Sequence, residues 1–364
     1  MSILGSFFGA NKSQSVIGLD ISSSAIKLVQ LKKVKGRAVL ETYGELALGP
    51  YMGLDRGHST NLPAEKISEA LKNILEASKT TTKECGASLP LSASLISLLK
   101  LPTDSESELA KMVPLEIRKY LPVNISEVAL DWWVIPKDDS VMGGRDTGGP
   151  SQTEVLTVSV HKDTILKYQQ IISGANLDVG FFEVEVFSTI RSALEPSINP
   201  MILLDLGSST TKIYIVERGV IRDSHIINRG SQDITQALSS GLNVSLERAE
   251  DFKRGENIIG VEPQRILEIE TLVLEDIFAE ASRVILNYQK KRNKAVMRVV
   301  LAGGGSILSN ALPVASKFFE TEVTLADPFS KVEAPAFLRD VLAKAGPEFA
   351  VAIGVALRKL DELG

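Results

Sequence analysis

The sequence of 364 residues contains one cysteine, Cys85, and three histidines that lie far apart, at positions 58, 161 and 225. A single cysteine excludes a disulfide within the chain, and a reducing, cytosolic compartment fits this usage best. The histidines lack the spacing of metal ligands, so a structural zinc site is not expected. No uninterrupted apolar run reaches about 18 residues, so no membrane-spanning helix is expected either.

The charge and composition exclude further classes. A net charge of −5 leaves no basic excess of the kind that nucleic-acid-binding proteins carry. With 44% hydrophobic and 23% charged residues, the composition is that of a globular protein, and the length suits about two to three domain-sized units. The N-terminal segment has no secretory signal, and its apolar residues, Ile3, Leu4, Phe7 and Phe8, belong either to a frayed end or to a surface for a membrane or partner.

In the first half of the chain, the hydrophobic pattern alternates between strands and helices. Residues 16–21, 25–33 and 37–47 predict three antiparallel strands joined by tight turns. A Gly/Pro-rich loop at 48–63 follows. Beyond it the pattern predicts strands at 84–90, 94–102, 128–136 and 154–162, helices at 64–78, 104–120 (interrupted at Pro114), 163–176 and 184–194, and a flexible loop at 137–153.

The second half begins in the same way. Residues 200–227 predict a strand, a polar turn, a strand, an Arg218-Gly219 turn and a strand. After them come helices at 231–240 and 245–254, a long helix from Pro263 to Lys291, a strand with a glycine triplet and a helix start within 297–313, and an amphipathic helix within 346–363. This alternation of sheets and helices indicates the α/β class.

A short motif recurs in the two halves. DISSSAIK (20–27) and DLGSSTTK (205–212) share an aspartate, two serines and a lysine at the same spacing, each between two strands. Backbone N–H groups of such turns form a donor site for anions, and an aspartate at the strand end suits magnesium and its waters. A third element, VVLAGGGSILSNA (299–311), permits close approach of a ligand. The simpler alternative is two ordinary Ser-rich hairpins with capping aspartates.

These motifs resemble those of the actin-like ATPase superfamily, and the chain from about 13 to 360 is similar to its PilM family of type IV pilus assembly proteins. The matching stretches include VIGLDISSSAIKLVQL, ISEVALDWWVI, LTVSVHKDTILKYQQIISGANLDVGFFEVEVFS, AEDFKRG, VVLAGGGSILSNA and FAVAIGVALRKL. The resemblance implies an α/β actin-like ATPase fold, with two similar lobes around a nucleotide cleft and a small inserted subdomain like that of FtsA.

The resemblance also implies domain boundaries. They are 1–12 for a flexible N-terminus, 13–84 for the core of lobe I, 85–178 for the inserted subdomain, 179–198 for a connecting helix, 199–230 and 298–345 for the core of lobe II, 231–297 for its upper subdomain, and 346–364 for a C-terminal helix that returns to lobe I.

For function, the resemblance implies a cytoplasmic scaffold, peripheral at the inner membrane, that binds ATP and Mg²⁺ and takes part in pilus assembly and twitching motility. Its expected partner is the N-terminal tail of a PilN-like single-pass membrane protein, and pilus motor components and self-association are further expectations. Two alternatives stay open. One is a small-molecule kinase, which requires an aspartate base in the cleft. The other is an FtsA-like division filament, which would carry a separate amphipathic helix after RKLDELG.

Site residues follow from the same resemblance. Asp20 and Asp205 match the aspartates that organise the metal and its waters. Glu250 and Lys253 match a pair near the ribose and base, or else form a solvated i,i+3 ion pair. The remaining nucleotide-binding positions are Ser22, Ser23, Ser24 and Lys27 in the first turn, Gly207, Ser208, Ser209 and Thr210 in the second, and Gly303, Gly304, Gly305 and Ser306 in the adenosine loop.

A catalytic group is less clearly indicated. Hydrolysis requires a residue that positions the attacking water. Glu183 and Glu185 are expected to enter the helix that joins the lobes, and Glu185 is the candidate catalytic residue. Its alternative is a helix N-terminal carboxylate favoured by the macrodipole. We therefore expect ATP hydrolysis to be weak or absent. Trp132 and Trp133 form either a partner surface or part of a packed sheet.

Overall fold

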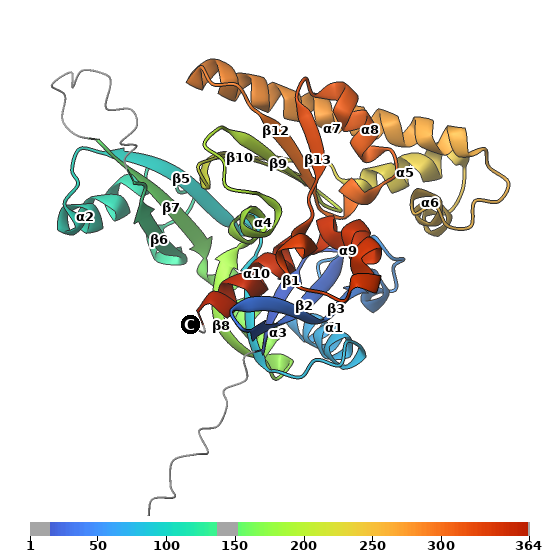
Figure 1. The fold of residues 1–364 in the computed structure, drawn as a ribbon, viewed down its shortest axis with the longest axis horizontal. Helices are drawn as coiled ribbons and strands as arrows, with labels where there is room; N and C mark the ends of the chain where they lie inside the picture. Colours follow the sequence, from blue (N-terminus) through green and yellow to red (C-terminus); the bar gives the residue numbers. More distant parts are fainter. Residues whose placement is uncertain (1–14, 137–151, 363–364) are drawn as a thin grey trace, which may run out of the picture.

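The computed structural model describes residues 15–136 and 152–362. The expected N-terminus at 1–12 and most of the expected loop at 137–153 lie outside these residues. The described chain forms two five-stranded sheets and one three-stranded sheet, with helices around them (Figure 1). This is the α/β class that the sequence predicts.

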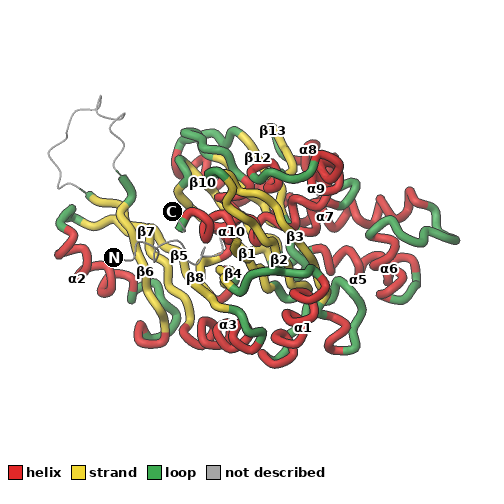
Figure 2. Tube along the Cα trace, turned by 60° about the horizontal axis from the view of Figure 1, so that its bottom comes forward, coloured by secondary structure: helices red, strands yellow, loops and turns green. Residues whose placement is uncertain are grey.

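The first sheet has the strand order β3-β2-β1-β4-β8. Its strands are β1 (Ser15–Ile21), β2 (Ala25–Val34), β3 (Arg37–Ala47), β4 (Glu84–Leu89) and β8 (Asp178–Val184). One face carries α1 (Ala64–Ala77) and α3 (Lys162–Gly174), which lie side by side (Figure 2). The other face packs on α10 (Ala350–Asp361), beside α4 (Glu185–Ala193). The three predicted antiparallel strands at the start of the chain are confirmed.

The second sheet has the equivalent order β11-β10-β9-β12-β13. Its strands are β9 (Met201–Leu206), β10 (Thr211–Glu217), β11 (Val220–Ile227), β12 (Arg298–Ala302) and β13 (Glu322–Leu325). The helices that share its apolar core are α5 (Ser231–Leu242), α6 (Leu246–Lys253), α7 (Pro263–Arg292) and α8 (Ala311–Phe318). A shorter helix, α9 (Arg339–Ala345), precedes α10. The two lobes therefore repeat one topology.

The third sheet stands to one side of the two lobes (Figure 1). It has the order β5-β7-β6 and consists of β5 (Ser94–Leu101), β6 (Val128–Val134) and β7 (Thr153–His161), with α2 (Glu106–Ile117) packed on it. The strands of this sheet span 94–161, within the expected subdomain 85–178, while β4 pairs with β1 and α3 packs on α1. The boundaries of the subdomain stay a prediction.

Two local expectations were wrong. Helix α2 is not interrupted at Pro114, because Val113 and Ile117 on either side are buried against the third sheet and keep the helix continuous. Glu183 does not enter a helix but lies in β8, and the helix begins at Glu185. The sequence pattern missed β8 because its half-buried residues merge with the apolar helix that follows.

Helix α10 approaches the first lobe closely at two glycines. A Cβ atom on Gly18 of β1 would lie 2.0 Å from the carbonyl oxygen of Ala352, and one on Gly354 would lie 1.9 Å from that of Ser188 in α4. Polar contacts reinforce this packing: Arg191 donates to the carbonyl oxygen of Gly354 at 2.8 Å. These close approaches require glycine at positions 18 and 354.

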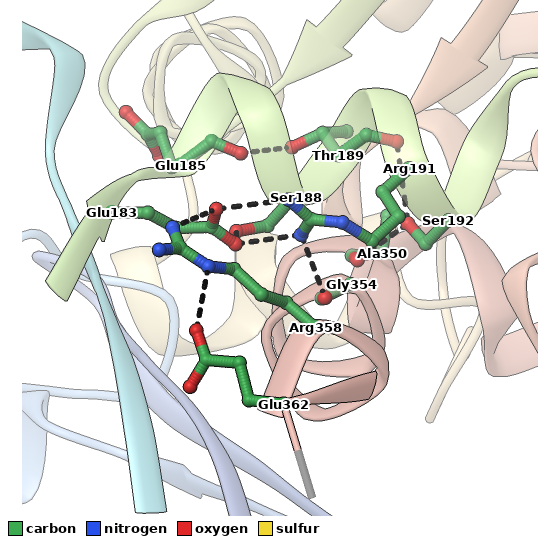
Figure 3. A network of polar contacts seen from close by, with 10 residues as sticks. All are labelled: Glu183, Glu185, Ser188, Thr189, Arg191, Ser192, Ala350, Gly354, Arg358 and Glu362. Carbon is green, nitrogen blue, oxygen red and sulfur yellow. Dashed lines mark hydrogen bonds and ion pairs between the residues drawn. The ribbon is translucent and has the colours of Figure 1, made fainter. Parts of the chain in front are cut away.

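Glu183 of β8 forms polar contacts with both α4 and α10 (Figure 3). Its carboxylate accepts hydrogen bonds from Arg191 of α4 at 2.7 Å and from Arg358 of α10 at 2.9 Å. Although burial favours the protonated form, these guanidinium groups and Ser188 hold the pKa of Glu183 below its usual value. Glu183 is therefore a structural ion-pair residue. Figure 3 shows the side chain of Glu185 pointing away from the polar contacts around Glu183.

The glycine contact gives a stability prediction. Gly354→Ala places a methyl group against the Ser188 carbonyl, so we expect it to lower the free energy of unfolding by about 3 kcal/mol, measured by chemical denaturation. The control Gly241→Ala, in α5, meets only the terminal methyl of Ile269 and should be neutral or slightly stabilising. A loss below about 0.5 kcal/mol for Gly354→Ala would contradict the packing described.

Candidate functional site

A cavity of about 900 Å³ lies between the two lobes. Residues of both repeated turns line it, as do residues of α4, α6 and the glycine triplet. Every site residue expected from the sequence lines it except Gly305 and Ser306, which are buried. The structure thus brings the expected residues together, and their individual roles remain predictions.

The sequence repeat is also a repeat of strand register. Asp20 at the end of β1 lies opposite Lys27 of β2, and Asp205 at the end of β9 lies opposite Lys212 of β10. Equivalent hydrogen bonds close both turns: the N–H of Ser22 donates to the carbonyl oxygen of Ala25, and that of Gly207 donates to Thr210, each at 3.0 Å. The two turns are therefore copies in backbone geometry as well as in sequence.

Asp20 is a buried carboxylate with one close hydrogen-bond donor. The Ser88 hydroxyl donates to its Oδ1 at 3.1 Å. Burial raises the pKa of Asp20 to about 6, although Lys27 opposes this shift. Lys27 itself pairs with Glu45 of β3 at 3.3 Å. Lys27 is thus held by a neighbouring glutamate, and within residues 15–136 and 152–362 no cation forms an ion pair with Asp20.

Lys212, which lines the cavity, connects the two lobes through an ion pair. Its Nζ lies 2.8 Å from Glu185 Oε2 in α4 and 3.4 Å from Asp205 Oδ2 in β9. Burial disfavours the charged lysine, but Glu185 and Asp205 hold the pKa of Lys212 well above its usual value. The backbone N–H of Leu91 donates to Glu185 Oε1 at 2.7 Å. Both carboxylate oxygens of the candidate catalytic residue are therefore already hydrogen-bonded.

The glycine triplet combines close packing with one open position. Gly303 has φ +83°, and a Cβ atom there would lie 2.3 Å from Asp205 Oδ1. Gly305 is similarly crowded by Leu206, whereas a Cβ on Gly304 would meet nothing closer than Glu348 Oε2 at 3.8 Å. Ser306 closes the turn by donating its hydroxyl to the carbonyl oxygen of Gly303 at 2.7 Å. Of the three glycines, Gly304 thus presents the most open backbone to the cavity.

Glu250 and Lys253 form a buried ion pair at 2.5 Å, not a solvated one. Burial would raise the pKa of Glu250, but Lys253, Thr235 and Arg254 together lower it. The Lys253 ammonium also donates to the Thr235 hydroxyl at 2.8 Å. This pair of side chains is fixed in place beside the cavity.

Several residues of the cavity were not predicted. Glu45 and Ser88 flank the first aspartate, Arg254 follows the Glu250 pair, and Glu348 faces Gly304. Burial raises the pKa of Glu348 to about 7, and the nearby Glu45 adds to this effect. Lys212 could have been found, because it is the second copy of the repeated lysine. Arg254 lies within the AEDFKRG stretch, whereas Glu45, Ser88 and Glu348 come from separate elements and carry no local sequence signal.

In residues 15–136 and 152–362 no group of three or more His, Cys, Asp or Glu is placed to hold a metal ion on its own. None of the helices in the same part of the chain has the length and apolar character needed to span a bilayer.

The chain is similar to known proteins in both sequence and fold. A family model described as type IV pilus assembly protein PilM matches residues 18–360. A solved PilM-PilN type IV pilus biogenesis complex contains a chain with 23% identity and a TM-score of 0.78, over 95% of this chain and 98% of that one.

More distant relatives share the fold. The cell division protein FtsA of Pseudomonas aeruginosa is 22% identical over 357 residues, which cover 86% of this chain and 83% of FtsA. MreB5 of Spiroplasma citri bound to ADP has a TM-score of 0.51 at 11% identity, over 96% of this chain and 99% of that one. These similarities identify the fold as the actin-like ATPase fold, as the resemblance in sequence implied.

The Lys212 ion pair gives a second stability prediction. Lys212→Met leaves Glu185 and Asp205 buried without a cation, so we expect the free energy of unfolding to fall by about 3 kcal/mol in denaturant titrations. The matched variant Lys27→Met should cost only about 1 kcal/mol, because its partner Glu45 is 37% exposed. Equal losses for the two variants would contradict this assignment.

Proposed function

The chain belongs to the PilM family of type IV pilus assembly proteins, and we propose on this premise that it binds ATP with magnesium between its lobes and serves as a scaffold of the pilus assembly platform. The observation that carries the proposal is the pair of register-matched turns facing one cavity. Two such turns supply backbone N–H donors from opposite sides, which suits a chain of phosphates.

The nucleotide part of the proposal is supported by the residues around the cavity. Ser22, Ser23 and Ser24 in the first turn would hold phosphates together with Gly207, Ser208, Ser209 and Thr210 in the second. The open backbone of Gly304 would lie against the nucleoside, with Glu250 and Lys253 beside it. The related fold of MreB5 has been solved with ADP and with AMPPNP bound. These features together favour ATP over a ligand without phosphates.

Magnesium would be held jointly by protein and nucleotide. Two carboxylates, Asp20 and Asp205, line the cavity, and magnesium is usually bound by one or two carboxylates with waters and phosphate oxygens. Burial raises the pKa of Asp20 to about 6, and no cation in the described part of the chain is paired with this carboxylate. A divalent cation would stabilise its ionised form. The donor set therefore fits magnesium brought in with a nucleotide.

Holding a nucleotide is better supported than cleaving it. A carboxylate that acts as a general base must be free to accept a proton from water. Glu185 instead accepts from Lys212 and from the Leu91 N–H. We propose that turnover is weak or absent for this reason, and that nucleotide binding stabilises the scaffold.

The partner part of the proposal rests on the family. A relative of this fold has been solved in a PilM-PilN complex. We propose that this chain binds the cytoplasmic N-terminal tail of a PilN-like membrane protein, which would place it in the cytoplasm at the inner membrane. Pilus motor components and self-association are further proposed contacts. The exposed Trp133 on β6, whose ring lies 5.4 Å from that of Phe187 in α4, is a suitable partner surface.

The nucleotide proposal predicts the effect of removing either aspartate. Asp20→Ala and Asp205→Ala should each weaken binding of ATP with magnesium by about tenfold or more in titration calorimetry. Each substitution removes a negatively charged carboxylate that would hold the magnesium ion. The control Asp223→Ala, on the exposed edge strand β11, should bind like the unchanged protein. If both cleft variants bind ATP normally, the assignment of these aspartates is wrong.

The partner proposal predicts binding of a peptide. A labelled peptide of the N-terminal cytoplasmic tail of the PilN-like protein from the same organism should bind in fluorescence anisotropy, and a scrambled peptide should not. Trp133→Ala should weaken binding about tenfold, as expected for an aromatic anchor. Phe337→Ala, which removes a side chain that is 82% exposed elsewhere, serves as the control. Equal binding by both variants would exclude Trp133 from the partner surface.

A further inference from the structure

Residues 57–60, in the loop between β3 and α1, contact both lobes at the two repeated turns. We propose that this segment, here called the clasp, ties the lobes together and is released when the phosphates of a nucleotide enter the cleft. The identity of the releasing ligand rests on the proposed function, whereas the clasp itself rests on contacts between described residues.

The first lobe holds the clasp through Ser23. The backbone N–H and the hydroxyl of Thr60 both donate to the carbonyl oxygen of Ser23, each at 2.8 Å. The hydroxyls of Ser23 and Ser59 are hydrogen-bonded to each other at 2.7 Å. These three bonds fix the clasp to the first of the repeated turns.

The second lobe holds the same segment through two bonds. The Ser208 hydroxyl, in the second repeated turn, donates to the carbonyl oxygen of Gly57 at 2.8 Å. The side-chain oxygen of Gln232, in the first turn of α5, accepts from the backbone N–H of Ser59 at 3.3 Å. Gly57 and Ser59 thus bond to the second lobe, and Ser59 and Thr60 bond to the first.

Gly57 is shaped for this position. Its φ of +83° favours glycine, and a Cβ atom there would lie 2.7 Å from the Glu250 carboxyl carbon. Glu250 is held in turn by Lys253 and Arg254, so it has little freedom to withdraw. The clasp is therefore seated against the part of the second lobe that lines the nucleoside end of the proposed site.

A phosphate group would compete with the clasp for the Ser208 proton. A serine hydroxyl has a single donor hydrogen, and in the structure that hydrogen is directed to Gly57. A phosphate oxygen is a charged acceptor and forms a stronger hydrogen bond than a backbone carbonyl does. Phosphates bound at the second turn would therefore take this hydrogen, and the clasp would keep only the Gln232 bond to the second lobe.

Proteolysis can report this release, because Arg56 is exposed and immediately precedes the clasp. Trypsin cleavage after Arg56, quantified by mass spectrometry in the full chain, follows the fraction of molecules with an open segment. Cleavage after the exposed Arg118, in the separate third-sheet unit, serves as the internal reference. We expect saturating ATP with magnesium to raise the relative cleavage after Arg56 by about three- to tenfold, the effect of losing one hydrogen bond. Adenosine, which has no phosphate, should not raise it.

A variant outside the proposed phosphate turns tests the clasp without nucleotide. Gln232→Ala removes the acceptor of the Ser59 N–H and should raise cleavage after Arg56 by a similar factor in the absence of ATP. Gln236→Ala lies one turn further along α5 and is exposed, so it should be cleaved like the unchanged protein.

The outcomes separate the clasp from the nucleotide proposal. If calorimetry shows ATP binding but neither ATP nor Gln232→Ala raises cleavage after Arg56, the clasp is overturned and the nucleotide site stands. If ATP does not bind but Gln232→Ala raises cleavage, the segment ties the lobes and release by phosphate is overturned. A fall in cleavage on ATP binding would likewise overturn release.

Discussion

The buried ion pair between Lys212 and Glu185 sets how the two lobes meet. Lys212 belongs to the second sheet and Glu185 to the helix that follows the first, so this contact joins two units that otherwise repeat each other. Neither charge can be left alone in so buried a place without a large cost. Around the pair, apolar residues of both sheets share one core cluster. With the lobes joined in this way, the two repeated turns face a single cavity instead of separate surfaces.

The same contact bears on what the cavity can do. Each repeated lysine is paired with a glutamate, Lys27 with Glu45 and Lys212 with Glu185, while Asp20 accepts a hydrogen bond from Ser88. The Asp20 carboxylate is therefore available for a cation, whereas Glu185, the candidate for activating water, is already held by Lys212. These contacts support the proposal that the cavity holds a nucleotide with little or no hydrolysis, as proposed for a scaffold in pilus assembly.

Much of this architecture was readable from sequence because it depends on local patterns. Strand alternation and turn residues predicted both three-strand units, and the repeated Asp-x-x-Ser-Ser-x-x-Lys spacing predicted that their turns are equivalent. The sequence could not reveal β8, because its pattern runs into helix α4, nor the partners Glu45, Ser88 and Glu348, which reach the cavity from distant segments. Pro114 misled because tertiary packing, which has no local signal, keeps α2 continuous.

The central claim is that the two lobes together hold one nucleotide. Titration of ATP into the unchanged protein, with and without magnesium, tests it most directly. We expect saturable binding of one ATP per chain that strengthens when magnesium is present and that adenosine does not reproduce. Absence of ATP binding under both conditions, or binding indifferent to magnesium and to the phosphates, would contradict it.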